Sequence, residues 1–433
     1  MTNQTLSNRD ISVLWHPCTQ MKDHETFPII PIARGAGIYL YDFDGNQYID
    51  AISSWWVNLF GHAHPYINSK VKEQLDTLEH VILAGFTHEG IVRLSERLVA
   101  LAPEGLRRCF YADNGSSAIE VALKMSYHAH KNNGANKGVF VSLSNSYHGE
   151  TLGALSIGDV ALYKETYEPL LIRSVQTPVP NNNTIEAAQK AIEAYEQLLQ
   201  ERSDEIAALI VEPLVQGAGG MVMYHPYFLT KAKELSAQYG VHFIADEIMV
   251  GFGRTGTLFA CEQAGITPDF LILSKGLTGG YLPLSVVLTT EKIYNTFYCD
   301  YDPYRSFLHS HSYTGNALAC AAANATLDIF ESQNVIESNK LLSRTMAHEL
   351  LRFEHRPEVK EIRQCGMIGV IELTGFDPSE RIGVKLHRHC LGLGVLIRPL
   401  GSVIYVMPPY LISVSELVRV FDAIESALNE HCV

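Results

Sequence analysis

Between about residues 90 and 290 the chain alternates short, continuously apolar segments with longer helical patterns. Segments that are apolar at every position are typical of strands buried on both faces, and parallel strands of this kind are joined by helices. The pattern therefore predicts an α/β fold with a mostly parallel central sheet flanked by helices. Helices are expected over Ser117–Lys131 and Pro226–Tyr239, the second closed by Gly240. The expected strands are Cys109–Ala112, Val139–Leu143, Ala208–Val211, Phe243–Ala245, Phe270–Leu273 and Ser285–Leu288.

Segments outside this region show other patterns. Residues 37–50 alternate around Asp44-Gly45, which indicates a β-hairpin. Residues 180–205 begin with Pro-Asn-Asn-Asn-Thr and then become helical and charged, so a surface excursion is expected there. After about residue 335 a helical stretch, two strands and a closing helix indicate a separate α+β unit. Its two strands are expected over Met367–Leu373 and Val395–Pro399.

Composition excludes several classes of partner. The 433 residues carry a formal net charge of -14, and both nucleic acid and anionic membranes require basic patches. The eight cysteines are scattered without CxxC pairs, as in proteins of a reducing compartment. The first ten residues are polar, and no apolar run approaches the ~18 residues of a membrane span. A soluble, cytoplasmic protein is expected.

Lys275 follows the apolar strand Phe270–Leu273 after one residue, Ser274. A buried ammonium group costs several kcal/mol unless its pKa shifts or it reacts, and a desolvated lysine condenses with carbonyl groups to form Schiff bases. Asp246 ends the preceding apolar strand. A lysine imine together with an aspartate facing a pyridinium nitrogen is the pair that pyridoxal phosphate requires. A structural Lys–Asp salt bridge explains the two residues equally well.

Two segments that follow strands carry further candidates. Gly115 and Ser116 open a helix after a strand, a position at which open sheets bind phosphate, although an ordinary serine N-cap is the alternative. Tyr147 follows the strand Val139–Leu143. An aromatic ring there can lie on the face of a cofactor, and a structural tyrosine is the alternative.

Two patterns point to rival chemistries. Gly251–Gly256 spells GxGxxG, but Asp246 and Glu247 just before it would repel a pyrophosphate, and no convincing helix follows. Histidines are grouped at His62-Ala-His64, His309-Ser-His311 and His387-Arg-His389-Cys390. None of these groups supplies three ligands at a zinc-like spacing, so no metal site is expected.

Three residues are candidates for contacts with a substrate. Neighbouring side chains in an extended chain point to opposite sides, so Trp55 and Trp56 cannot both face one core. One of them is expected to face a pocket or an interface. Arg398 follows an apolar strand and suits a bidentate clamp on a carboxylate, with a plain surface arginine as the alternative.

In combination these segments resemble the class III (subgroup II) pyridoxal-phosphate aminotransferases. The resemblance rests on Asp246-Glu247, Gly251-Phe-Gly-Arg254-Thr-Gly256 and Lys275-Gly276-Leu-Thr-Gly279-Gly280. Further stretches resemble the branch of the class that aminates 8-amino-7-oxononanoate in biotin biosynthesis. These stretches are Trp15-His-Pro17, Ser53-Ser-Trp55-Trp56, Ile210-Val-Glu-Pro213, Val215–Gly220, Arg398-Pro-Leu-Gly401 and Ile404–Tyr410.

The resemblance implies a fold-type I homodimer whose active sites are built from both subunits. The large domain would span residues 61–330, and residues 1–60 and 331–433 would form a smaller α+β domain from both termini. The resemblance further implies that Lys275 holds the cofactor, Asp246 keeps the pyridine nitrogen protonated and Tyr147 stacks on the ring. The other implied contacts are Gly115, Ser116, His311 and Ser312 on the phosphate, the last two from the partner subunit, and Cys18, Trp55, Trp56, Ser310 and Arg398 on the substrate.

The implied reaction is a ping-pong transfer to 8-amino-7-oxononanoate with S-adenosyl-L-methionine as the usual amino donor. Cys18 stands where the family often has tyrosine, Glu150 where it has aspartate, and Ser310–Ser312 where it has Gly-Pro-Thr. Some members use lysine as the donor, and the departures leave that alternative open. A class III enzyme acting on ornithine, acetylornithine or 4-aminobutyrate is the nearest rival, and a nicotinamide-dependent oxidoreductase is a rival from another class.

Overall fold

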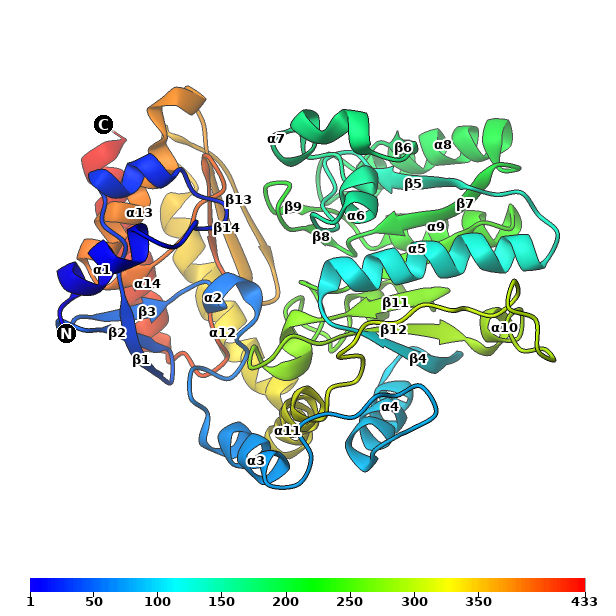
Figure 1. Ribbon diagram of the computed structural model, residues 1–433. Coiled ribbons are helices and arrows are strands. Elements are labelled where there is room, and N and C mark those ends of the chain that lie inside the picture. The colour runs from blue at the N-terminus through cyan, green and yellow to red at the C-terminus, as the bar shows by residue number, and fades with distance from the viewer. Residues whose placement is uncertain (433) are drawn as a thin grey trace.

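The computed structural model describes residues 1–432 and shows two parts side by side (Figure 1). One part is built on a large sheet, and the other contains both ends of the chain and smaller sheets. No helix within the described residues is both long and apolar enough to cross a membrane.

The large sheet has seven strands in the order β4-β12-β11-β10-β7-β5-β6. All neighbours are parallel except those of β12, which is antiparallel to β11 and to β4. This confirms the predicted mostly parallel sheet. The strands are β4 (Leu106–Ala112), β5 (Val139–Leu143), β6 (Ser174–Thr177), β7 (Ile206–Val211), β10 (His242–Asp246), β11 (Phe270–Leu273) and β12 (Ser285–Thr290).

Helices cover both faces of this sheet, which explains why its strands are apolar throughout. Helix α5 (Gly115–Asn132) packs on one face, where the buried residues include Ile210, Ile244 and Ile272. The neighbouring strand residues point into the core on the opposite face. That face is covered by α8 (Ile185–Arg202) and α9 (Tyr227–Gln238).

The expectation of a surface excursion at residues 180–205 is wrong. Helix α8 packs against α9, and Tyr195 is fully buried between them with its hydroxyl 2.8 Å from Ser236 Oγ. Small and apolar residues recur along the buried face of α8, while its charged residues face outward. The high proportion of charged residues in this segment suggested a surface position, although its apolar residues recur at helical spacing.

The second part joins the two ends of the chain through a shared sheet. Strand β15, from the C-terminal region, runs parallel to β3, from the N-terminal region. Strands β2 and β3 form the predicted hairpin. This sheet has the order β1-β2-β3-β15, and a separate sheet has the order β13-β14-β16. The strands are β1 (Ile32–Ala36), β2 (Tyr39–Asp42), β3 (Gln47–Asp50), β13 (Val359–Cys365), β14 (Ile368–Leu373), β15 (Val395–Leu396) and β16 (Val403–Val406).

The remaining elements connect or cover these sheets. Helix α11 lies between the two parts and packs against α3, α4 and α12 (Figure 1). The helices are α1 (Asn3–Ile11), α2 (Ser53–Trp56), α3 (Pro65–Leu75), α4 (Glu89–Leu101), α6 (Leu152–Ile157), α7 (Ala161–Lys164), α10 (Glu291–Tyr294), α11 (Ala317–Gln333), α12 (Val335–Leu350), α13 (Ile382–Gly392) and α14 (Val414–His431). A short hairpin, β8 (Val215–Gln216) and β9 (Val222–Met223), completes the fold.

Arg254 ties the two parts together. Its side chain is 1% exposed, and its guanidinium donates to the carbonyl oxygens of Pro408 at 2.8 Å and Asn58 at 3.2 Å. The guanidinium also lies 5.0 Å from the centre of the Tyr410 ring. One side chain therefore satisfies backbone groups from both ends of the chain.

Replacing Arg254 by methionine is expected to lower the free energy of unfolding by about 2–6 kcal/mol. Two buried carbonyl groups would lose their donors, and each such loss costs about 1–3 kcal/mol. Urea unfolding measures the change. Arg93→Met is the control, because Arg93 is half exposed and pairs with Asp328 at the surface, where ion pairs contribute up to about 1 kcal/mol. Equal changes in the two variants would contradict the assignment.

Candidate active site

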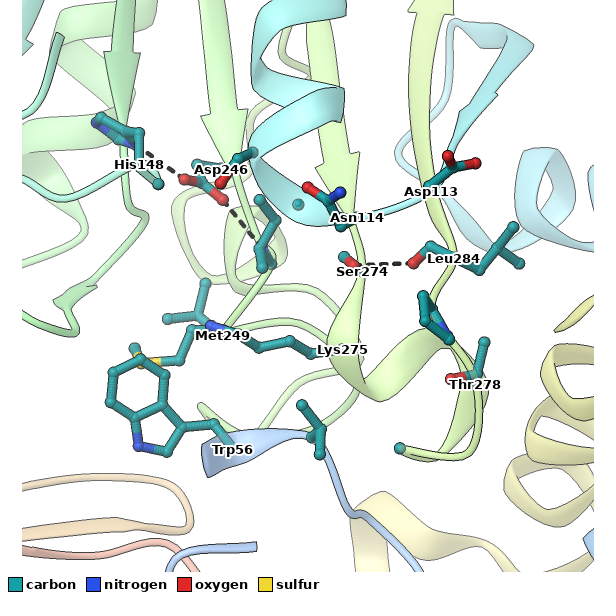
Figure 2. A pocket seen from close by; sticks show the side chains of 18 of the residues that line it. Trp56, Asp113, Asn114, His148, Asp246, Met249, Ser274, Lys275, Thr278 and Leu284 are labelled. Carbon is teal, nitrogen blue, oxygen red and sulfur yellow. Dashed lines mark hydrogen bonds and ion pairs between the residues drawn. The ribbon is translucent and has the colours of Figure 1, made fainter. Parts of the chain in front are cut away.

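A cavity of about 450 Å³ lies at the carboxyl ends of the parallel strands (Figure 2). Loops after five strands of the large sheet contribute to its lining, because parallel strands end at the same edge of a sheet. The lining residues that follow these strands are Asp113, Asn114, Gly115 and Ser116 after β4, Tyr147, His148 and Gly149 after β5, Glu212 after β7, Ile248, Met249 and Val250 after Asp246 of β10, and Ser274 and Lys275 after β11.

Lys275 extends over the indole ring of Trp56, on the side of the cavity below Asp246 (Figure 2). Its Nζ lies 4.5 Å from the centre of that ring. The residue has a positive φ of 46°, which costs a non-glycine residue conformational energy and is frequent at functional sites. Burial lowers the pKa of Lys275 to about 8, although the nearby carboxylates of Asp246 and Glu212 oppose this shift.

This shift predicts the pH dependence of the reactivity of Lys275. Because burial disfavours the charged form, the fraction of neutral amine rises as the pH rises through about 8. Reductive methylation with formaldehyde consumes neutral amines. In cofactor-free protein we expect its rate at Lys275 to be half-maximal near pH 8, whereas surface lysines should follow an ordinary pKa of about 10.4. Peptide mass spectrometry over a pH series gives both curves. If they coincide, the amine of Lys275 is not perturbed.

Asp246 is held in a fixed orientation at the end of β10. Its carboxylate lies 2.8 Å from Nδ1 of His148 and accepts a hydrogen bond from the backbone N–H of Ile248 at 3.1 Å. Asp246 and His148 are 5% and 2% exposed. From the sequence alone, His148 has no assigned role and is also compatible with an ordinary loop residue. Only the position of β5 two strands away from β10 brings the imidazole to the carboxylate, so no local pattern could have indicated it.

Glu212 is a second acid that the sequence reading did not assign. It accepts hydrogen bonds from the backbone N–H groups of Tyr147 at 2.9 Å and Gly217 at 2.8 Å. Burial raises its pKa to about 7, with the charge of Asp246 adding to the shift and His148 opposing it. Its side chain fixes the loop that carries Tyr147 and His148. The sequence feature that could have pointed to Glu212 is its position, with Pro213, directly after an apolar strand.

The start of α5 forms a polar corner of the cavity. Asn114 caps the helix through its side chain, which accepts from the Ser117 N–H at 3.0 Å. Gly115 and Ser116 follow in the first turn, which contains no acidic residue. The free N–H groups and the dipole of a helix start favour an anion. At Gly115 a side-chain Cβ would lie 2.9 Å from Cδ1 of Ile248, so a larger residue here would require the isoleucine side chain to shift.

Tyr147 lines the cavity beside this corner. Its hydroxyl donates to Glu150 Oε1 at 3.0 Å, and its ring meets Tyr163 edge-on at 5.4 Å between centroids. Burial raises the pKa of the phenol, so the hydroxyl stays protonated at neutral pH. The ring is thus available for contact with a flat ligand.

Three of the expected substrate contacts form a group of their own outside the cavity lining. Arg398 donates to the carbonyl of Cys18 at 2.7 Å, and its guanidinium lies 4.9 Å from the centre of the Trp55 ring. Trp56 is buried in the cavity, whereas Trp55 is 38% exposed. The two tryptophans thus face different surroundings, as expected. The reason differs, because Ser53–Trp56 has positive φ angles and is not extended.

Ser310, His311 and Ser312 do not reach the cavity of their own chain. The Ser312 carbonyl lies 2.8 Å from His80 Nε2, and His311 lies beside His309, with 3.2 Å between their Nε2 atoms. That these residues serve the site of a partner subunit stays a prediction.

The residues of the cavity fit pyridoxal phosphate. A helix start suited to a phosphate, an amine with a lowered pKa, a fixed carboxylate and the aromatic ring of Tyr147 all line one cavity. This is the donor set that such a cofactor needs for its phosphate, its aldehyde and its ring nitrogen.

Comparisons with known proteins agree with this chemistry. The family model Aminotransferase class-III matches residues 19–428. Among curated proteins, the adenosylmethionine-8-amino-7-oxononanoate aminotransferase of Helicobacter pylori is 52% identical, with 99% of this chain and 98% of that protein covered. The protein of the same name from Geobacter sulfurreducens is 39% identical, with 98% of each chain covered.

Solved structures show the same likeness. The crystal structure of adenosylmethionine-8-amino-7-oxononanoate aminotransferase from Methanocaldococcus jannaschii is 35% identical and has a TM-score of 0.95, covering 99% of this chain and 100% of that one. The omega transaminase from Pseudomonas jessenii, solved in complex with PMP, is 27% identical with a TM-score of 0.93, covering 98% of each chain.

Proposed function

Since this chain belongs to the class III aminotransferases, we propose that it transfers an amino group from S-adenosyl-L-methionine to 8-amino-7-oxononanoate, in biotin biosynthesis. The amino-group transfer itself, with pyridoxal phosphate as cofactor, is the activity of the class. The observation that carries the assignment of residues is the pairing of Lys275 and Asp246 in one cavity. The substrates are supported by the names of relatives up to 52% identical over the whole chain.

The cofactor would be held at three points. Lys275 would bind it covalently, Gly115 and Ser116 would bind its phosphate through the start of α5, and Tyr147 would cover its ring. Asp246 would face the ring nitrogen, with His148 at 2.8 Å fixing the carboxylate. When bound, pyridoxal phosphate acts as an electron sink for the carbon that exchanges its amino group.

Residues of the chain would then move the proton that is transferred during the exchange of the amino group. The lowered pKa of Lys275, about 8, makes its amine able both to accept and to donate a proton near neutral pH. Trp56, whose ring centre lies 4.5 Å from the amine, and Tyr147, which lines the same cavity, would keep bulk water from the proton. Glu212 holds the loop of Tyr147 through a backbone hydrogen bond of 2.9 Å.

Substrate carboxylate recognition is assigned to Arg398. Its guanidinium lies on Trp55 and is tethered to the Cys18 carbonyl, so the arginine is oriented by neighbours at the edge of the site. An arginine fork suits a carboxylate in two-point contact. Trp55 and Cys18 would shape the same substrate pocket, with Ser310 contributed by the partner subunit.

A cytoplasmic homodimer is part of the proposal. The segment that carries Ser310, His311 and Ser312 exposes large apolar side chains, with Tyr301 and Tyr304 94% and 88% exposed in the single chain. Exposed apolar patches of this kind mark interfaces. All eight cysteines are free thiols, as is usual in a reducing compartment.

The test incubates purified protein with 8-amino-7-oxononanoate and, in separate reactions, S-adenosyl-L-methionine, lysine, ornithine or 4-aminobutyrate. Mass spectrometry should detect 7,8-diaminononanoate in the reaction with S-adenosyl-L-methionine. Product with lysine alone would overturn the choice of donor. In further reactions 2-oxoglutarate replaces the ketone as amino acceptor. Turnover of ornithine or 4-aminobutyrate with 2-oxoglutarate, with no diamine formed from 8-amino-7-oxononanoate and any donor, would overturn the choice of substrate.

A further inference from the structure

His389, Glu430 and His431 meet at the outer ends of two helices of the smaller part. His389 lies near the end of α13, and the other two residues close α14. One ligand atom from each of the three side chains lies within 4.8 Å of the other two. None of them lines the Lys275 cavity. The sequence predicts no metal site at His387-Arg-His389-Cys390, because this group alone does not supply three ligands at a zinc-like spacing. The two partners of His389 follow 41 and 42 residues later (430 − 389 and 431 − 389).

The ring of His389 is positioned from both sides. Its Nε2 lies 2.9 Å from Ser426 Oγ, and its Nδ1 lies 3.4 Å from Glu430 Oε2. The serine fixes the ring plane and leaves Nδ1 directed at the carboxylate. Histidine ligands of metals are usually held in this way, with the second ring nitrogen hydrogen-bonded to a neighbour.

The imidazole of His431 adds a third possible ligand to the His389–Glu430 pair. The His431 ring lies edge-on to that of His389, at 5.4 Å between centroids. It belongs to the last turn of α14, where the partial negative charge of the helix end favours a cation. Glu430 is 66% exposed, so its carboxylate can move toward both imidazoles at little cost.

We propose that His389, Glu430 and His431 bind a divalent first-row transition metal ion, with Zn²⁺ as the best match. Two imidazole nitrogens and one carboxylate form an established zinc ligand set, and water can fill the fourth position. The ion would tie the end of α14 to α13. Since it binds only the folded arrangement, it would stabilise the C-terminal helix against unfolding.

The ordinary alternative is a His–Glu ion pair with a neighbouring histidine and no metal. The two readings differ in what Ser426 does. In the ion pair it is a minor hydrogen-bond partner. In the metal site it orients a ligand, and loss of such a partner weakens metal binding about 10- to 100-fold.

The test titrates the holoenzyme with Zn²⁺ by calorimetry and follows its thermal midpoint. The wild type should show a saturable site that is absent in His389→Ala and His431→Ala and weakened about 10- to 100-fold in Ser426→Ala. Glu430→Gln removes an exposed ligand without disturbing the packing and should also lose the site. His348→Ala, with a side chain 80% exposed on α12, is the control for adventitious histidine binding and should retain it.

Crystals soaked in Zn²⁺ supply the second measurement. An anomalous peak about 2.0–2.2 Å from the three ligand atoms supports the site. Identical titrations of wild type and His389→Ala, or zinc found only at other groups such as the free thiols, would overturn it. Amino-group transfer should be unchanged in all these variants without metal, so the outcome is independent of the proposed function.

Discussion

Lys275→Ala is expected to abolish amino-group transfer, with kcat falling at least about 10⁴-fold, the upper range for a positioned acid–base group. The variant loses both the amine that would hold the cofactor and the group that would move the proton. Among the residues described by the structure, no other lysine lines this cavity, so none is placed to take over its role. Single-turnover kinetics with saturating cofactor measure the loss.

Two controls separate chemistry from folding in this variant. The thermal midpoint without substrate should not fall, because alanine removes a lysine whose charged form is disfavoured by burial. Added methylamine should restore part of the rate, since a small amine can enter the space left by the side chain. Wild-type turnover by the alanine variant would refute the role of Lys275.

Asp246→Asn should lower kcat about 10²–10³-fold, as is typical when one fixed electrostatic partner of the reacting group is removed. The amide keeps the shape of the side chain and can still contact Nδ1 of His148, but it lacks the charge that would stabilise a protonated ring nitrogen. The expected loss is in kcat more than in KM, because Asp246 would act on the pyridine ring of the cofactor and not on the bound substrate.

His148→Gln is the matched comparison for Asp246. It removes the imidazole that positions the carboxylate and leaves the charge, so its effect on kcat should be smaller than that of Asp246→Asn. Asp246→Glu keeps the charge on a longer arm and should lie between the two. If Asp246→Asn were no worse than His148→Gln, the charge of Asp246 would not be the important property.

The strands of the large sheet were predictable because burial on both faces requires short segments that are apolar at every position. Neighbouring residues such as Leu209 and Ile210 enter different core clusters on opposite sides of the sheet, so every position must be apolar. Residues that follow these strands closely, such as Lys275 and Ser116, could be expected at one edge, because parallel strands end at the same edge of a sheet. Their common cavity follows from the parallel order of the strands.

Contacts between segments far apart in the chain produce no local sequence pattern of this kind. The residues of β15 read as part of the C-terminal unit, yet this strand pairs with β3 more than 300 residues earlier (395 − 49 = 346). His148 and Glu212 join Asp246 and the Tyr147 loop only through the order of β5, β7 and β10. His389 meets His431 only because α13 packs on α14. Each depends on strand order or helix packing, which local periodicity does not encode.

The covalent attachment of the cofactor is the claim on which the mechanism depends, and one measurement tests it directly. Holoenzyme is reduced with borohydride, digested with trypsin and analysed by mass spectrometry. Trypsin does not cut after a modified lysine, so a pyridoxyl group on Lys275 should appear on the single peptide Thr255–Lys292. A peptide that ends at an unmodified Lys275, or a pyridoxyl group on any other lysine, would contradict the assignment.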